Sequence, residues 1–159
     1  MVLPLAAATA LLAAAAGFTV WYDTTTADFE QALQRYSSEL SLPPGTDRDA
    51  YVAQLRAQGL ERPLQISEEG VNSMVSHYGA CTWLKAWQVR TDAKDTAGAK
   101  QALETYRRAI ASPALKVNDG GGVVANLERV ADAAATGNRA RVAQELKNNC
   151  SSLPSDGIR

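Results

Sequence analysis

The sequence predicts an all-α protein: a single N-terminal transmembrane helix followed by a compact bundle of about five to six helices. Of the 159 residues, 29 are alanine, the strongest intrinsic helix former, whereas aromatic residues, which favour strands, make up only 6%. The first 22 residues carry no charged side chain, and every Lys, Arg, Asp, Glu and His lies after them. From there on, apolar residues recur at helical spacing between breaks that contain Gly or Pro.

These patterns divide the chain into three regions. We expect residues 1–22 to be a transmembrane anchor or uncleaved signal segment, residues 23–150 an extracytoplasmic α-helical domain, and residues 151–159 a flexible polar tail. The net charge is −1, from 16 basic and 17 acidic residues. This balance gives no basic surface that would bind nucleic acid, which is therefore not an expected partner, and none that would hold the chain on anionic lipid by charge.

The N-terminal segment has the length and flanks of a membrane anchor. Its uncharged run of about 20 residues matches the thickness of the hydrocarbon layer, and Trp21 and Tyr22 suit the membrane–water interface. Small residues recur at four-residue spacing, among them Ala10, Ala13 and Gly17, and such faces let helices approach closely in lipid. The expected partners are therefore the lipid bilayer and a membrane protein complex.

A cleaved signal peptide is the alternative for the same segment. The run Ala14-Ala15-Ala16 resembles a cleavage site of the A-x-A type, which would release a secreted protein after Ala16. No basic residue precedes the apolar run, and the first positive side chain is Arg35. The basic flank that usually sets the orientation of a segment in the membrane is therefore missing. Both alternatives stay open, and the uncleaved anchor is the one expected.

The only cysteines, Cys81 and Cys150, are expected to form a disulfide. In an oxidising compartment, closing a loop of this length would stabilise the fold by about 4 kcal/mol, whereas in a reducing cytosol the two would be ordinary thiols. An even number of cysteines behind a signal-like segment favours export. The alternative is a buried apolar Cys81 and an incidental thiol at Cys150.

Local signals predict the first two helices of the domain. Residues 24–26 followed by Asp28 predict a helix start, because hydroxyls cap the helix and an acid suits its first turn. Residues 43–45, with the sequence Pro-Pro-Gly, predict the end of that helix. A short second helix is expected to open at residues 46–47 and to close at Gly59.

The next two helices are expected to pack against each other. Ser67 followed by two glutamates predicts the start of the longest helix, over residues 68–90. The chain is expected to turn at residues 92–98. A fourth helix then runs to about Ala111, where residues 112–113, Ser-Pro, stop it.

The C-terminal part predicts two further helices. We expect residues 114–117 to be extended or irregular and the glycine-rich residues 118–122 to form a turn. A fifth helix over residues 123–134 ends at residues 137–138, where Gly closes one helix and Asn caps the next. The sixth ends near Cys150, and packing it on the longest helix would bring the two cysteines together.

The residues that could form a metal or catalytic site make up one weakly indicated group. His77 lies four residues before Cys81 and therefore on the same helical face; with Met74 and Cys150 it has the soft ligands that suit copper or zinc. Met74 and Cys81 fall on the predicted core stripe and His77 lies beside it, so we expect no metal and no cofactor. The sequence marks no third group that would orient a Cys–His pair, and we assign no catalytic residue and expect no enzyme.

A second pair, Trp83 and Trp87, suggests a contact surface. Tryptophan is enriched among interface anchors, and the pair can lie half-exposed beside the core stripe or fill the core itself. We expect a non-enzymatic accessory or assembly subunit whose helical domain packs beside a membrane protein partner. The alternative is an exported small-ligand or metal-binding helical protein that uses the His77/Cys81 face or the Trp83/Trp87 flank.

Overall fold

The computed structural model describes residues 26–61, 66–151, 153 and 158, and within these ranges the chain forms seven α-helices and no strand. The all-α prediction is thereby confirmed for this part of the chain. The predicted anchor, its small-residue face and its possible cleavage site lie outside the described residues. None of the helices that the structure describes is long and apolar enough to cross a membrane.

The helices follow one another with short connections. Their bounds are α1 Thr26–Glu39, α2 Arg48–Glu61, α3 Glu68–Asp92, α4 Thr96–Ile110, α5 Pro113–Val117, α6 Val123–Ala135 and α7 Arg139–Asn149.

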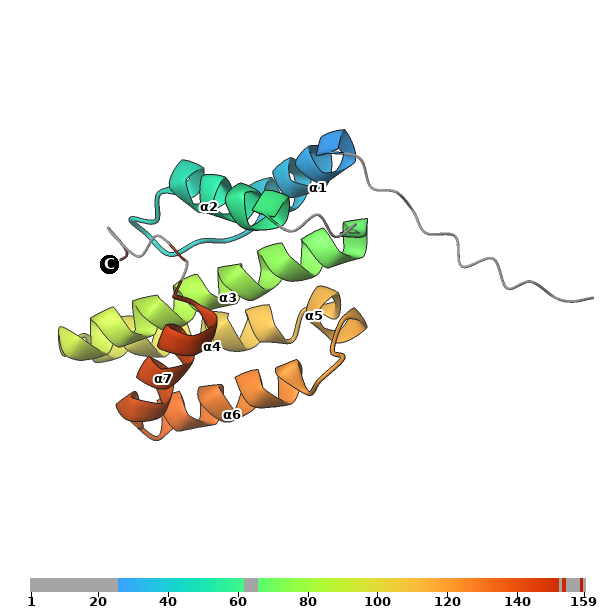
Figure 1. Cartoon of the computed structure of the whole chain (residues 1–159). Helices are drawn as coiled ribbons and strands as arrows, with labels where there is room; N and C mark the ends of the chain where they lie inside the picture. Colours follow the sequence, from blue (N-terminus) through green and yellow to red (C-terminus); the bar gives the residue numbers. More distant parts are fainter. Residues whose placement is uncertain (1–25, 62–65, 152, 154–157, 159) are drawn as a thin grey trace, which may run out of the picture.

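The long helix α3 is the centre of the bundle (Figure 1). The α1–α2 pair lies along one side of it, whereas α4 and α6 lie on the other side and α7 crosses near its C-terminal half. Helix α3 contacts α1, α4, α5 and α7, and α6 is held through α4 and α7. Because neighbours cover α3 on several sides, every residue from Gly79 to Leu84 is buried.

Two apolar clusters divide α3 between them. The N-terminal half of α3 supplies Val71 and Val75 to a cluster with α1 and α2. The C-terminal half supplies Trp83 and Trp87, among others, to a larger cluster with α4, α5, α6 and α7. The structure is therefore one bundle with a shared central helix, rather than a helix pair attached to a separate domain.

The local signals at helix starts act as the sequence predicts. The Ser67 hydroxyl accepts a hydrogen bond from the backbone N–H of Gly70, and the Asn138 side chain accepts one from the N–H of Arg141. Gly137 has a positive φ of 76°, which glycine adopts at little steric cost, and it separates α6 from α7. The side-chain oxygens satisfy donors that the first helical turn leaves free.

Two local predictions are wrong. Residues 114–117 are helical, because Ser112 caps the N–H of Ala114 and Pro113, which ends α4, also has the φ that a first helical residue needs. Helix α2 continues past Gly59 to Glu61. This glycine is needed for packing and does not end the helix, because a Cβ at this position would collide with the ring of Phe29.

The predicted flexible tail is corrected at two of the three positions that the structure describes there. Ile158 is only 6% exposed and belongs to the larger cluster, and Leu153 packs against the α1–α2 cluster. The polar composition predicted a loose tail, but these two apolar side chains pack on the bundle.

Candidate functional site: a disulfide, a buried carboxylate and a polar pocket

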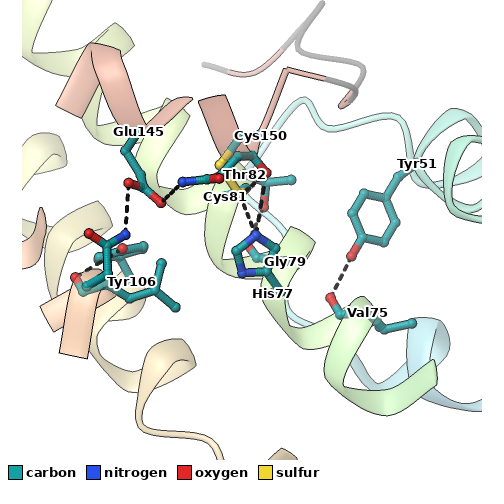
Figure 2. The surroundings of a disulfide bond; sticks show 12 residues. Tyr51, Val75, His77, Gly79, Cys81, Thr82, Tyr106, Glu145 and Cys150 are labelled. Atoms are coloured by element: carbon teal, nitrogen blue, oxygen red, sulfur yellow. Dashed lines mark hydrogen bonds between the residues drawn. A yellow bond between two sulfur atoms is a disulfide. The ribbon is translucent and has the colours of Figure 1, made fainter. Parts of the chain in front are cut away.

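A disulfide joins Cys81 in α3 to Cys150, directly after α7 (Figure 2). The two Cα atoms are 5.7 Å apart, within the usual range for this bond, and both side chains are buried. The predicted pairing is thus present, and it results from the predicted packing of the last helix on the longest one. It fixes the C-terminal end of α7 against the middle of α3.

His77 lies directly beside this disulfide (Figure 2). Its Nε2 is 3.8 Å from Sγ of Cys81 and 3.4 Å from the backbone carbonyl oxygen of Asn149. Burial lowers the pKa of His77 below its ordinary value, although the contact with Asn149 and the negative charge of Glu145 act in the opposite direction. The imidazole is therefore neutral at neutral pH, with one nitrogen as donor and the other as acceptor.

The structure leaves the metal alternative without its ligand set. Cys81 and Cys150 are bonded to each other, so neither provides a thiolate, and Met74 packs against the α1–α2 cluster. The described residues contain no group of three or more His, Cys, Asp or Glu side chains that could hold a metal ion. The disulfide also removes the free thiol that a Cys81–His77 nucleophile pair would need.

Trp83 and Trp87 are core residues. They are 7% and 4% exposed, and the indole N–H of Trp83 donates to the backbone carbonyl of Ser41. Of the two arrangements that the sequence left open for this pair, the structure has the core filling and not the half-exposed flank. The reason is that α3 is covered on more than one side, so that residues beside the predicted stripe are buried too.

The sequence did not single out Glu145, although it is the centre of a buried polar network. Its carboxylate, on α7, is only 2% exposed and accepts hydrogen bonds from the side-chain amides of Asn126 on α6 and Asn149 on α7 at 3.0 and 2.8 Å. Arg141 lies 3.5 Å from the same carboxylate and also donates to the amide oxygen of Asn126. The buried charge is thus compensated on every side, as a buried carboxylate must be.

A polar pocket lies between this network and His77. Its volume is about 510 Å³, within the range of small-molecule sites, and it is larger than the 280 Å³ cleft on the other side of the disulfide. Helix α3 contributes His77, α6 contributes Asn126 and Arg129, and α7 contributes Glu145 and Asn149, while residues 121–123 complete the wall. The pocket therefore joins three helices and the glycine-rich loop, which the sequence suggested only as a turn.

Sequence reasoning found His77 and missed the other members of this pocket. Glu145 and Asn149 are four residues apart on α7, a spacing shared by many solvated helix residues. Asn126 and Arg129 lie on a different helix, and only the packing of α6 against α7 brings them close. His77 was visible because it is the only histidine of the chain.

Comparison of the chain with protein-family models, with curated proteins and with solved structures finds no match. Functional inference therefore rests on the residues and geometry described above.

The environment of His77 predicts a specific pH dependence of stability. In the unfolded chain, the imidazole takes up a proton as the pH falls through about 6.5, whereas the folded protein resists protonation until its lower pKa is reached. The unfolded state binds more protons in this window, so stability is lost below pH 6.5 and the loss levels off below the folded pKa. Urea unfolding near pH 7.5 and pH 5 should show a smaller loss in His77→Gln than in the wild type.

The comparison between the two proteins removes the contribution of carboxylates that titrate in the same range. Glu145 faces His77 from α7 and is present in both proteins. Equal losses of stability in the wild type and the variant would mean that His77 is as easily protonated in the fold as in the unfolded chain.

Proposed function

We propose that this protein is a membrane-tethered, non-enzymatic accessory or assembly subunit whose helical domain lies beside a membrane protein partner on the extracytoplasmic side. The observation that carries the proposal is the Cys81–Cys150 disulfide in a chain whose first 22 residues are uncharged. Disulfides persist in oxidising compartments, and an uncharged segment of this length is what a membrane anchor requires.

The composition of the anchor supports a role in assembly as well as attachment. Alanine contributes little to insertion, so the segment depends on a modest number of Leu, Val and Phe residues for its affinity for lipid. Ala10, Ala13 and Gly17 would lie on one side of a helix and allow a neighbouring membrane helix to approach closely. The tether would then form part of the surface that binds the partner.

Extraction in a mild detergent tests the assembly role. The protein should co-purify with a membrane protein in stoichiometric amount. The triple variant Ala10→Leu, Ala13→Leu, Gly17→Leu should stay in the membrane fraction, because leucine favours insertion, but should lose the partner, because its larger side chains prevent close helix approach.

The matched control places the same three leucines on the opposite side of the predicted helix, as Ala8→Leu, Ala15→Leu, Thr19→Leu. This variant should keep both the membrane association and the partner. Recovery of the wild type as a free monomer after mild extraction, or equal loss of the partner in both triple variants, would refute the assembly role.

Intact mass of the native protein tests the compartment and the tether together. The wild type should retain residues 1–16 and should react with an alkylating agent only after reduction, because both cysteines are in the disulfide. A mass that corresponds to cleavage after Ala16 would show an exported protein without its anchor. Alkylation of both cysteines without reduction would place the domain in a reducing compartment.

A further inference from the structure

We propose that the connection between α5 and α6 rests on the membrane surface, with Val117 and Val123 among the lipid headgroups. Residues 116–123, the valine loop, form the contact surface, and the partner is the lipid bilayer that holds the N-terminal segment. This inference rests on the proposed tethering role and adds to it the orientation of the helical bundle on the membrane.

The valine loop exposes apolar side chains of a kind that the bundle otherwise buries. Every residue of the loop is exposed, and Val117 and Val123 are 70% and 42% exposed. No other large apolar side chain is exposed among the residues that the structure describes. Single exposed apolar residues are common on protein surfaces, but two that flank one loop concentrate the apolar surface at one place.

The valine loop lies at the end of the bundle where α1 and α3 begin (Figure 1). The side-chain amide of Asn118 donates a hydrogen bond of 3.2 Å to the backbone carbonyl of Glu69, which holds the loop beside the first turn of α3. Tyr22, expected at the membrane–water interface, is four positions before Thr26, the first residue of α1. Four residues span at most about 14 Å, so an anchor that ends at Tyr22 keeps this end of the bundle near the headgroups.

The opposite end of the bundle has a different surface. The α3–α4 and α6–α7 connections lie there (Figure 1), and their exposed residues, 92–97 and 135–140, are charged, polar, glycine or alanine. Asp92 and Arg139 form an ion pair between these two connections. Exposed apolar side chains are thus found at the end that the anchor holds near lipid, and charged ones at the end that faces water.

The charges of the valine loop favour a membrane surface without net charge. Lys116 and Asp119 are its charged residues and compensate each other, and the exposed Glu69 beside the loop disfavours anionic lipid. The contact therefore depends on the valines, and added salt should not release it.

The tether makes a weak contact sufficient. Two valines would not hold a free domain on a bilayer, because even one myristoyl chain binds a membrane only marginally. In a tethered chain the membrane is always within reach, and the valine loop meets it at a high effective concentration. The contact then orients the bundle, while the anchor supplies the attachment.

Fluorescence quenching by lipid tests the contact in the full-length chain, reconstituted into phosphatidylcholine vesicles. Gly120→Cys carries a nitrobenzoxadiazole dye, since the native cysteines are in the disulfide and a Cβ at Gly120 meets no heavy atom within 4 Å. The comparison protein carries the same dye through Ala97→Cys, an exposed position at the opposite end. Lipids with a nitroxide near the headgroup should strongly quench the dye at residue 120 and hardly quench it at residue 97, at low and at high salt.

Two matched double variants test the valines in the chain labelled at residue 120. Val117→Asp, Val123→Asp should abolish the quenching by lipid, because charged side chains stay in water. Ala97→Asp, Ala140→Asp adds the same charge at the opposite end and should leave the quenching unchanged. All four positions are exposed, so both variants should fold.

Flotation of the chain with the vesicles separates this inference from the tether. A chain that floats but shows equal quenching at residues 120 and 97, or quenching that survives Val117→Asp, Val123→Asp, would overturn the contact and leave the tether intact. Protection of residue 120 from a water-soluble nitroxide without quenching by lipid would mean that a second copy of the chain covers the loop, and would overturn the contact too. A chain that does not float would contradict the tether and this inference together.

Discussion

Removing the disulfide with the double variant Cys81→Ala, Cys150→Ala should lower the free energy of unfolding by about 4 kcal/mol. The two cysteines are 69 residues apart in the sequence, and the link between them restricts the unfolded chain far more than the folded one. This loss is a large fraction of the 5–15 kcal/mol that is typical of a folded domain. Urea unfolding of the full-length chain measures it directly.

Reduction of the wild type is the matched control for this variant. The reduced wild type and the double variant should have nearly the same stability, because both lack the same covalent link. A change of less than about 1 kcal/mol in the double variant would show that the disulfide restricts the unfolded chain much less than its loop length implies.

The disulfide also links stability to the pocket. Residue 149 is next to Cys150 and contacts both His77 and Glu145. Loosening the end of α7 would therefore disturb the pocket wall as well as the packing of α7 on α3.

Trp87→Ala should lower the free energy of unfolding by about 3–5 kcal/mol, the usual cost of removing a buried aromatic side chain and leaving a cavity. The indole is 4% exposed in the cluster that joins α3 to α4, α6 and α7. The control is Val117→Ala at a side chain that is 70% exposed, which should change stability by less than about 0.5 kcal/mol.

This variant also decides between the two roles that the sequence offered for the tryptophans. A core residue affects folding, whereas a contact residue affects partner binding and leaves the isolated chain stable. Unchanged urea unfolding of Trp87→Ala, combined with loss of a co-purified partner, would restore the contact-surface hypothesis and contradict the burial described above.

Much of the helical order was predictable because its signals are local. Ser67 and Asn138 cap their helices through hydrogen bonds that span three residues, and Gly137 supplies a backbone conformation that other residues rarely adopt. These effects do not depend on what the helix later packs against. The partners of a disulfide were also predictable, because the chain has only one possible pair of cysteines.

Where local signals served two purposes, the sequence was ambiguous. Pro113 can end one helix or begin another, and it does both. Gly59 resembles a helix end, but its neighbour in space is Phe29, thirty positions earlier in the sequence. No pattern within one or two helical turns of either residue shows that Pro113 also begins a helix or that Gly59 packs against Phe29.

The sequence by itself determined the all-α class, the position of most helices and an uncharged N-terminal segment, and it left open whether its two cysteines pair. Only the tertiary structure decided that Trp83 and Trp87 are buried, that Glu145 is a compensated buried carboxylate and that His77 borders a polar pocket. The physical reason is the sequence distance over which each interaction acts. Capping and backbone strain act within a few residues, whereas burial and the composition of a pocket depend on which distant helices cover α3.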